Sequence, residues 1–169
     1  MSLGYKPTYF RPEEIISPAI FEICGPDALY MYDPQILRGM DAIRQVFGPM
    51  IANTWHSEKL IAKYGLHRFR GLRAKNQKIG ARLSAHKIGI KKYEKFPVLG
   101  KVPYSAIDLD PVKVTPQHIH AVIKESPIFW STFFTRIETH KPNGDPITWF
   151  HGDNKPHDGK TGLIKFFRG

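Results

Sequence analysis

At 169 residues, the chain has the length of a single domain, residues 1–169, that can bury a substantial core. Its only cysteine, Cys24, excludes an intramolecular disulfide and a structural zinc site built from cysteines. Lys and Arg outnumber Asp and Glu by 25 to 15, and the net charge of +10 favours polyanionic partners such as nucleic acid, a membrane surface or an anionic cell-wall polymer.

Helices are expected in the N-terminal third of the chain. Residues 10–24 ("FRPEEIISPAIFEIC") predict a short helix, because a proline followed by two acids suits a helix N-terminus. Residues 34–47 predict the clearest helix, which Asp33 can cap and Gly48 can end. Its apolar residues recur at helical spacing and form one stripe that should face the core: Ile36, Leu37, Met40, Ile43, Val46 and Phe47.

The rest of the chain predicts mostly strands. Residues 55–82 look loop-like and basic, whereas residues 115–126 predict a helix with Thr115 as its cap. The segment "KPNGDP" at 141–146 marks a turn between two strands. Helices first and then mostly strands indicate an α+β domain, with helices packed on one face of an antiparallel sheet. Strands are expected at residues 49–55, 104–114, 131–140, 146–151 and 161–167.

Two histidines and an aspartate at plausible strand ends are candidate metal ligands. A hydrolytic zinc site takes three protein ligands from His and Asp or Glu and leaves a position for water. His86, Asp108 and His151 can supply such a set, with Asp108 pointing away from its apolar strand neighbours. Taken singly, each residue also has an ordinary structural explanation. A histidine is more often hydrogen-bonded than metal-bound, and Asp108 can cap a turn before a proline.

Three short motifs follow one another in an order that resembles a known family. They are Ser84-Ala85-His86 with Gly89, Ala106-Ile107-Asp108 and Trp149-Phe150-His151, preceded by Arg73, Asn76 and Gly80-Ala81. Together they resemble the D-Ala-D-Ala carboxypeptidase family of zinc peptidases, whose fold is shared with hedgehog signalling domains. The likeness covers roughly residues 34–153. It implies a hedgehog/DD-peptidase-like fold, zinc held by His86, Asp108 and His151, and a peptidoglycan peptide as substrate.

The sequence departs from the family pattern between two of the ligands. In the family the first His and the Asp lie much closer together than the 22 positions that separate His86 from Asp108. Residues 90–104 ("IKKYEKFPVLGKVPY") therefore look like an insertion, which need not move either ligand because the cost of closing a loop grows slowly with its length. Asp110 is the alternative ligand if the register differs by two, since it shares a strand face with Asp108.

A second departure concerns the general base. Many relatives carry an acid or a histidine a few residues before the last ligand, whereas position 148 is a threonine here. Asp145, six positions before His151, is the expected base, although it can equally be a turn former beside a glycine. Glu138 and His140 on the preceding strand are alternatives.

Other residues are expected to help bind substrate or orient a ligand. Arg73 can pair with a substrate carboxylate or with the developing oxyanion, or can simply be one more basic residue. Ser84 can hydrogen-bond the substrate backbone. Asp153 can orient a metal ligand, or can simply be part of the loop "GDNKPHDGK".

The resemblance implies a zinc peptidase that hydrolyses peptide bonds of bacterial peptidoglycan, and an origin in a phage or prophage is likewise inferred from the family. No apolar run reaches the roughly 18 residues that span a bilayer. Because "MSLGYKPTYFRPEE" lacks a signal-peptide core, we expect cytoplasmic synthesis and a virion-associated or wall-delivered protein. One alternative is an inactive structural or binding module with the same fold. The other is a nucleic-acid-binding protein that uses a basic segment containing Arg68, Arg70, Arg73, Lys75 and Lys78.

Overall fold

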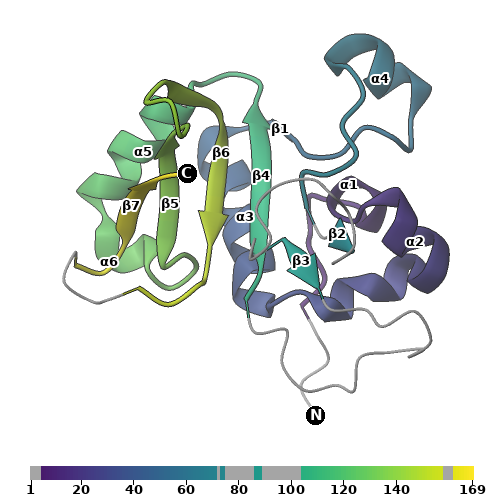
Figure 1. The fold of residues 1–169 in the computed structure, drawn as a ribbon, viewed down its shortest axis with the longest axis horizontal. Coiled ribbons are helices and arrows are strands. Elements are labelled where there is room, and N and C mark those ends of the chain that lie inside the picture. The colour runs from purple at the N-terminus through teal and green to yellow at the C-terminus, as the bar shows by residue number, and fades with distance from the viewer. Residues whose placement is uncertain (1–4, 72, 75–85, 89–103, 158–161) are drawn as a thin grey trace.

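The computed structural model describes residues 5–71, 73–74, 86–88, 104–157 and 162–169 (Figure 1). None of the helices in this described part has the length and apolar character that a bilayer crossing requires. The helices are α1 (Pro12–Ile15), α2 (Pro18–Cys24), the 3-10 helix η1 (Gly25–Met31), α3 (Pro34–Phe47), α4 (Glu58–Tyr64), α5 (Pro116–Glu125) and α6 (Pro127–Trp130). The strands are β1 (Met50–Ile51), β2 (Arg73–Ala74), β3 (Lys87–Ile88), β4 (Ala106–Pro111), β5 (Arg136–His140), β6 (Pro146–Asp153) and β7 (Lys165–Arg168).

Helix α3 confirms the clearest helix prediction, with the expected signals at both ends. The Asp33 side chain accepts a hydrogen bond of 2.8 Å from the Gln35 backbone N–H, and Gly48 ends the helix with a φ of 85° that favours glycine. The predicted apolar stripe is buried except for Val46, which is 55% exposed. Helix α5 likewise matches the prediction, and the Thr115 hydroxyl accepts from the His118 N–H.

The helix predicted at residues 10–24 is divided into α1 and α2. Ile16 and Ser17 between them are extended, with ψ values of 139° and 152°. Pro18 explains the break, because its ring disfavours helical geometry at the preceding residue and it opens α2 instead. The segment 55–82, predicted to be a loop, contains helix α4. The insertion predicted at 90–104 lies outside the described residues, apart from Tyr104.

The five-stranded sheet has the order β1-β4-β6-β5-β7 and is not entirely antiparallel, which corrects the prediction. β1/β4, β4/β6 and β6/β5 pair antiparallel, but β5 and β7 pair parallel. Because β6 already has two neighbours, the last strand adds to the free edge of β5 instead. The chain leaves β6 at the end where β5 begins, so β7 runs beside β5 in the same direction.

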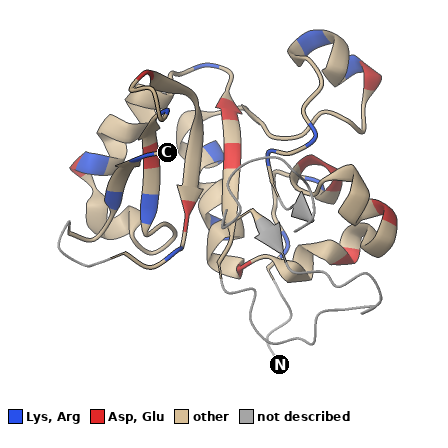
Figure 2. Ribbon diagram, viewed as in Figure 1, with Lys and Arg blue, Asp and Glu red and all other residues tan. Residues whose placement is uncertain are grey.

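Helices α3 and α5 lie against the same face of this sheet, as expected (Figure 1). The core between them contains Ile107 and Leu109 of β4, Ile137 of β5 and Phe150 of β6, all at most 1% exposed. Since side chains alternate along a strand, the residues between these apolar ones point to the opposite face. Figure 2 shows acidic residues on β4, on β5 and at the end of β6, and the strand register places Asp108, Glu138 and Asp153 on that opposite, polar face.

A second, two-stranded sheet adjoins the polar face of the first. β2 and β3 pair parallel, with Arg73 opposite Lys87. The segment that leads into β2 lies alongside β4, because the Asp108 N–H donates a hydrogen bond of 2.7 Å to the Arg70 carbonyl. This contact brings the β2–β3 unit next to the middle of β4.

The Gly152→Ala substitution tests the packing on the core face of the sheet, opposite the polar face. A Cβ at position 152 would lie 2.6 Å from the fully buried ring of Phe134 and 3.1 Å from Phe150, both in the core. We expect the free energy of unfolding to fall by about 1–3 kcal/mol, as is usual for overpacking. Thr148→Ala, at an exposed position of the same strand, should change it by only about 0.5 kcal/mol. Urea denaturation measures both, and equal stability of the two variants would contradict the packing argument.

Candidate metal centre

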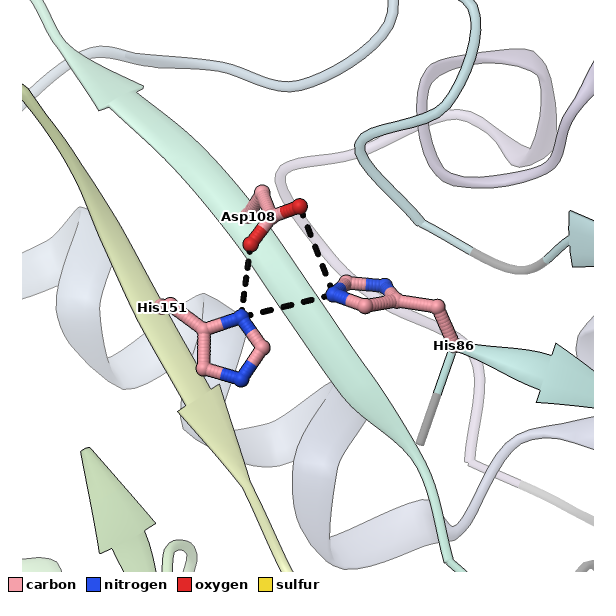
Figure 3. A group of neighbouring side chains, drawn as sticks. All are labelled: His86, Asp108 and His151. Carbon is pink, nitrogen blue, oxygen red and sulfur yellow. Dashed lines mark hydrogen bonds and ion pairs between the residues drawn. The ribbon is translucent and has the colours of Figure 1, made fainter. Parts of the chain in front are cut away.

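Three predicted metal ligands meet on the polar face of the sheet. Asp108 lies in the middle of β4 and His151 near the end of β6, and the two are opposite each other in the antiparallel register. His86 comes from the residue before β3 and reaches the pair from the other side of Asp108 (Figure 3). The three residues are 2%, 8% and 9% exposed in the order His86, Asp108 and His151. They form a buried group that can hold a metal ion.

The distances between the ligand atoms suit a single ion. His151 Nδ1 lies 2.7 Å from Asp108 Oδ1, His86 Nε2 lies 3.3 Å from Asp108 Oδ2, and the two imidazole nitrogens are 3.4 Å apart. Ligand atoms bound tetrahedrally at ~2.0–2.1 Å would be about 3.3 Å apart. A small readjustment of the short His151–Asp108 contact therefore suffices for all three to bind one cation.

A backbone carbonyl determines the orientation of His86. Its Nδ1 lies 3.0 Å from the Gly71 carbonyl, which can only accept, so Nδ1 carries a proton, and when the ring is neutral Nε2 presents its lone pair to the group. Such a contact is usual for metal-binding histidines. Gly71 cannot be replaced without movement, because a Cβ there would collide with the Ile15 carbonyl. The Tyr32 hydroxyl in turn donates to that carbonyl at 3.0 Å.

His151 is oriented by a carboxylate on its own strand. Its Nε2 lies 3.4 Å from Asp153 Oδ2, and Asp153 is held by two hydrogen bonds of 2.9 and 2.6 Å from the Arg136 guanidinium. A neutral His151 that donates from Nε2 directs the lone pair of Nδ1 towards Asp108 and His86. The position of Asp153 agrees with the orienting role expected for it.

The charges of the group are strongly coupled. Burial raises the pKa of Asp108, but the charge of His86 and hydrogen bonds from both histidines outweigh burial and hold the pKa well below its usual range. Burial lowers the pKa of His151, but the hydrogen bonds to Asp108 and Asp153 outweigh it and raise the pKa to about 10. For Asp153, burial is outweighed by the bonds from His151 and Arg136, and its pKa falls to about 2. A cation must therefore displace a proton from His151 to bind.

The alternative ligand Asp110 does not join the group. Its carboxylate accepts a hydrogen bond of 2.8 Å from the Arg70 guanidinium and lies 3.6 Å from His67 Nε2. The Arg70 guanidinium also lies over the ring of Trp149, 5.5 Å from its centroid. Asp110 is thus engaged in a separate ion pair beside the His86–Asp108–His151 group.

The structure also does not bring Asp145 to this group. Asp145 is exposed in the turn between β5 and β6, where its carboxylate accepts a hydrogen bond of 2.7 Å from Asn143. β6 runs without interruption from Pro146 to His151, a path of roughly 17 Å at the usual rise of a strand. This geometry corrects the expectation that Asp145 lies beside the ligands.

The two alternatives for the base occupy different places. Glu138 is the cross-strand partner of His151 on β5 and is half-buried, and burial raises its pKa while the charge of His151 opposes that shift. His140 is exposed and contacts the Thr139 hydroxyl. Arg73 lies in β2 but its side chain is outside the described part of the chain, as is all of Ser84.

Sequence reasoning missed two features of the site. One is the Gly71 carbonyl, which has no signal in the sequence because any residue carries a carbonyl. The other is Arg136, whose alternation with Glu138 along a strand could have placed both on the face of the ligands.

Comparisons of the chain with models of protein families, with curated proteins and with solved structures found no match. The function of the protein is therefore inferred from the geometry of this site and from its motif residues.

Substitution of the ligands should remove a bound divalent metal. We expect wild-type protein to retain about one ion per chain after dialysis, and His86→Ala or His151→Ala to weaken metal binding by more than about 100-fold, since even the partners of metal ligands contribute 10–100-fold. Asp110→Asn is the matched control and should keep the ion, because Asp110 binds Arg70 instead. Mass spectrometry of the metal content measures this. Full metal content in His86→Ala would rule out the site.

The raised pKa of His151 predicts opposite pH dependences with and without metal. In chelator-treated protein, protonated His151 contributes stability that is complete below pH 6.5, its unfolded pKa, and is lost as the pH rises towards about 10. Metal affinity should increase over the same interval, because His151 must lose its proton to bind. Tm measured from pH 6 to 10 should fall for the chelated wild type, and fall less for His151→Gln. Identical curves for the two proteins would contradict the assignment.

Proposed function

We propose that this protein is a zinc-dependent peptidase. The observation that carries the proposal is the buried His86–Asp108–His151 group, whose two imidazoles and one carboxylate converge at distances of 2.7 to 3.4 Å. Three such ligands with a position left open are the set found in catalytic zinc sites, whereas structural sites usually have four. Bound zinc would supply a Lewis acid that activates water and polarises a carbonyl.

The residues around the group fit this chemistry. The Gly71 carbonyl and Asp153 fix the two imidazoles in the orientations that expose Nε2 of His86 and Nδ1 of His151. Burial excludes bulk water from the ligands, which strengthens electrostatic interactions within the site. Arg73, in β2 beside the site, is proposed to bind a substrate carboxylate or the developing oxyanion, and Ser84 is proposed to hydrogen-bond the substrate backbone.

Peptidoglycan is the proposed substrate because of the motif resemblance and the charge of the chain. The net charge of +10 suits an anionic cell wall. A phage or prophage protein that acts on the cell wall, either as part of the virion or after release, would need both a peptidase site and a positive net charge. The bond cleaved would lie in the peptide stems or cross-links.

A structural metal in a binding module is the second candidate, and the burial of the ligands favours it. At 2% to 9% exposure, the three side chains leave little ligand surface open to solvent. Nucleic-acid binding has less support, because Arg70 from the basic segment is already paired with Asp110 and lies over Trp149.

Zinc-loaded protein should release peptides or amino acids from purified peptidoglycan, as measured by liquid chromatography and mass spectrometry. Chelation or His151→Ala should reduce release at least ~100-fold, and added zinc should restore only the chelated wild type. The number of reducing ends should not change, since glycan strands are not cleaved. One zinc per chain without any released peptide would instead support the structural metal.

A further inference from the structure

We propose that Glu138 is the catalytic base of this site, a role that rests on the proposed peptidase function. This acid lies on β5, the strand beside β6, which carries the last ligand, His151. The family pattern instead places the acid shortly before that ligand on the same strand, where this chain has Thr148.

The strand register places Glu138 in line with two of the metal ligands. Asp108 of β4 is opposite His151 of β6, and His151 is opposite Glu138 of β5. The three side chains therefore project from the same face of the sheet in one row. The Cβ atoms of directly opposite residues are about 4.5–5.5 Å apart. In this structure the Glu138 carboxylate lies against Gly169 on the β7 side of β5. A change of side-chain rotamer would bring it over the His151 ring towards the ligands.

The other acids near the site are already engaged. Asp110 and Asp153 each accept hydrogen bonds from an arginine, and Asp108 contacts both histidines. Asp145 is at the far end of β6. Among the described residues, Glu138 is the acid on this face for which no hydrogen bond or ion pair is found.

The surroundings of Glu138 shield its carboxylate without neutralising it. The side chain is half-buried, and the backbone of Gly169 after β7 packs against the carboxylate. The nearest cation on its own strand, Arg136, is committed to Asp153 and stacks over Phe167 at 4.7 Å. A half-buried carboxylate without a partner is unfavourable for stability, and such groups are concentrated at functional sites.

In the proposed reaction Glu138 transfers one proton. Water attacks the carbonyl carbon of the peptide bond, a C–O bond forms, and a water proton moves to a carboxylate oxygen of Glu138. The C–N bond then breaks with its electron pair remaining on nitrogen, and Glu138 returns the proton to that nitrogen. The products are a carboxylic acid and an amine, and Glu138 is again a carboxylate.

The test compares Glu138→Gln with the control Glu125→Gln, an exposed position at the end of α5. For soluble muropeptides, we expect Glu138→Gln to lower kcat by about 100-fold or more and to leave KM within about twofold, because the base acts only in the transition state. The zinc content should stay that of the wild type. Glu125→Gln should match the wild type in every measurement.

A crystal structure of the zinc-loaded wild type supplies a readout other than activity. A solvent molecule beside the zinc should lie about 2.6–3.2 Å from a Glu138 carboxylate oxygen. A carboxylate turned away from the metal would overturn the role of Glu138, as would loss of zinc from Glu138→Gln.

The kinetic outcomes separate the two proposals. If the wild type cleaves muropeptides and Glu138→Gln retains kcat within about threefold, Glu138 is not the base and the peptidase function stands. If the wild type binds zinc but cleaves nothing, the peptidase function is wrong, and the catalytic role of Glu138 falls with it.

Discussion

The antiparallel pairing of β4 with β6 is the constraint on which the site depends. It sets Asp108 directly opposite His151, and the same alternation that turns these side chains to one face turns Ile107, Leu109 and Phe150 into the core. A slip of one residue would expose the apolar set and bury the polar one, so packing of the core maintains the register of the ligands. The placement of Asp108 beside His151 thus follows from the hydrophobic pattern of two strands.

Burial of so many ionisable groups opposes stability unless each has a partner. His86, Asp108, His151 and Asp153 contact one another, and the Gly71 carbonyl and the Arg136 guanidinium complete the network. Removal of one partner leaves another group buried without compensation, which is costlier than the loss of the contact itself. The network therefore combines rigid orientation of the imidazoles with sensitivity to substitution at any of its members.

Local signals in the sequence predicted the parts of the fold that local physics determines. The Asp33 and Thr115 caps, the prolines that open α1, α3 and α5, and the Gly144 turn are where expected, since each depends on residues a few positions apart. The parallel course of β7 was not predictable, because it follows from which edge of the sheet the last strand joins. The motifs singled out three residues that the structure brings into one group able to hold a metal ion, but spacing along the chain was a poor guide to the other acids. Asp145 is close to His151 along the chain and distant in space, whereas Glu138 lies directly opposite His151 on the neighbouring strand β5.

The three ligands belong to two separate sheets. Asp108 and His151 are part of the five-stranded sheet, but His86 directly precedes β3 of the two-stranded one. An ion shared by all three would act as a clamp between the two, and its binding energy would add to whatever contacts already hold them together. Undocking of the smaller sheet would then have to break the bond between the ion and His86, so a bound ion would slow the separation of the two sheets.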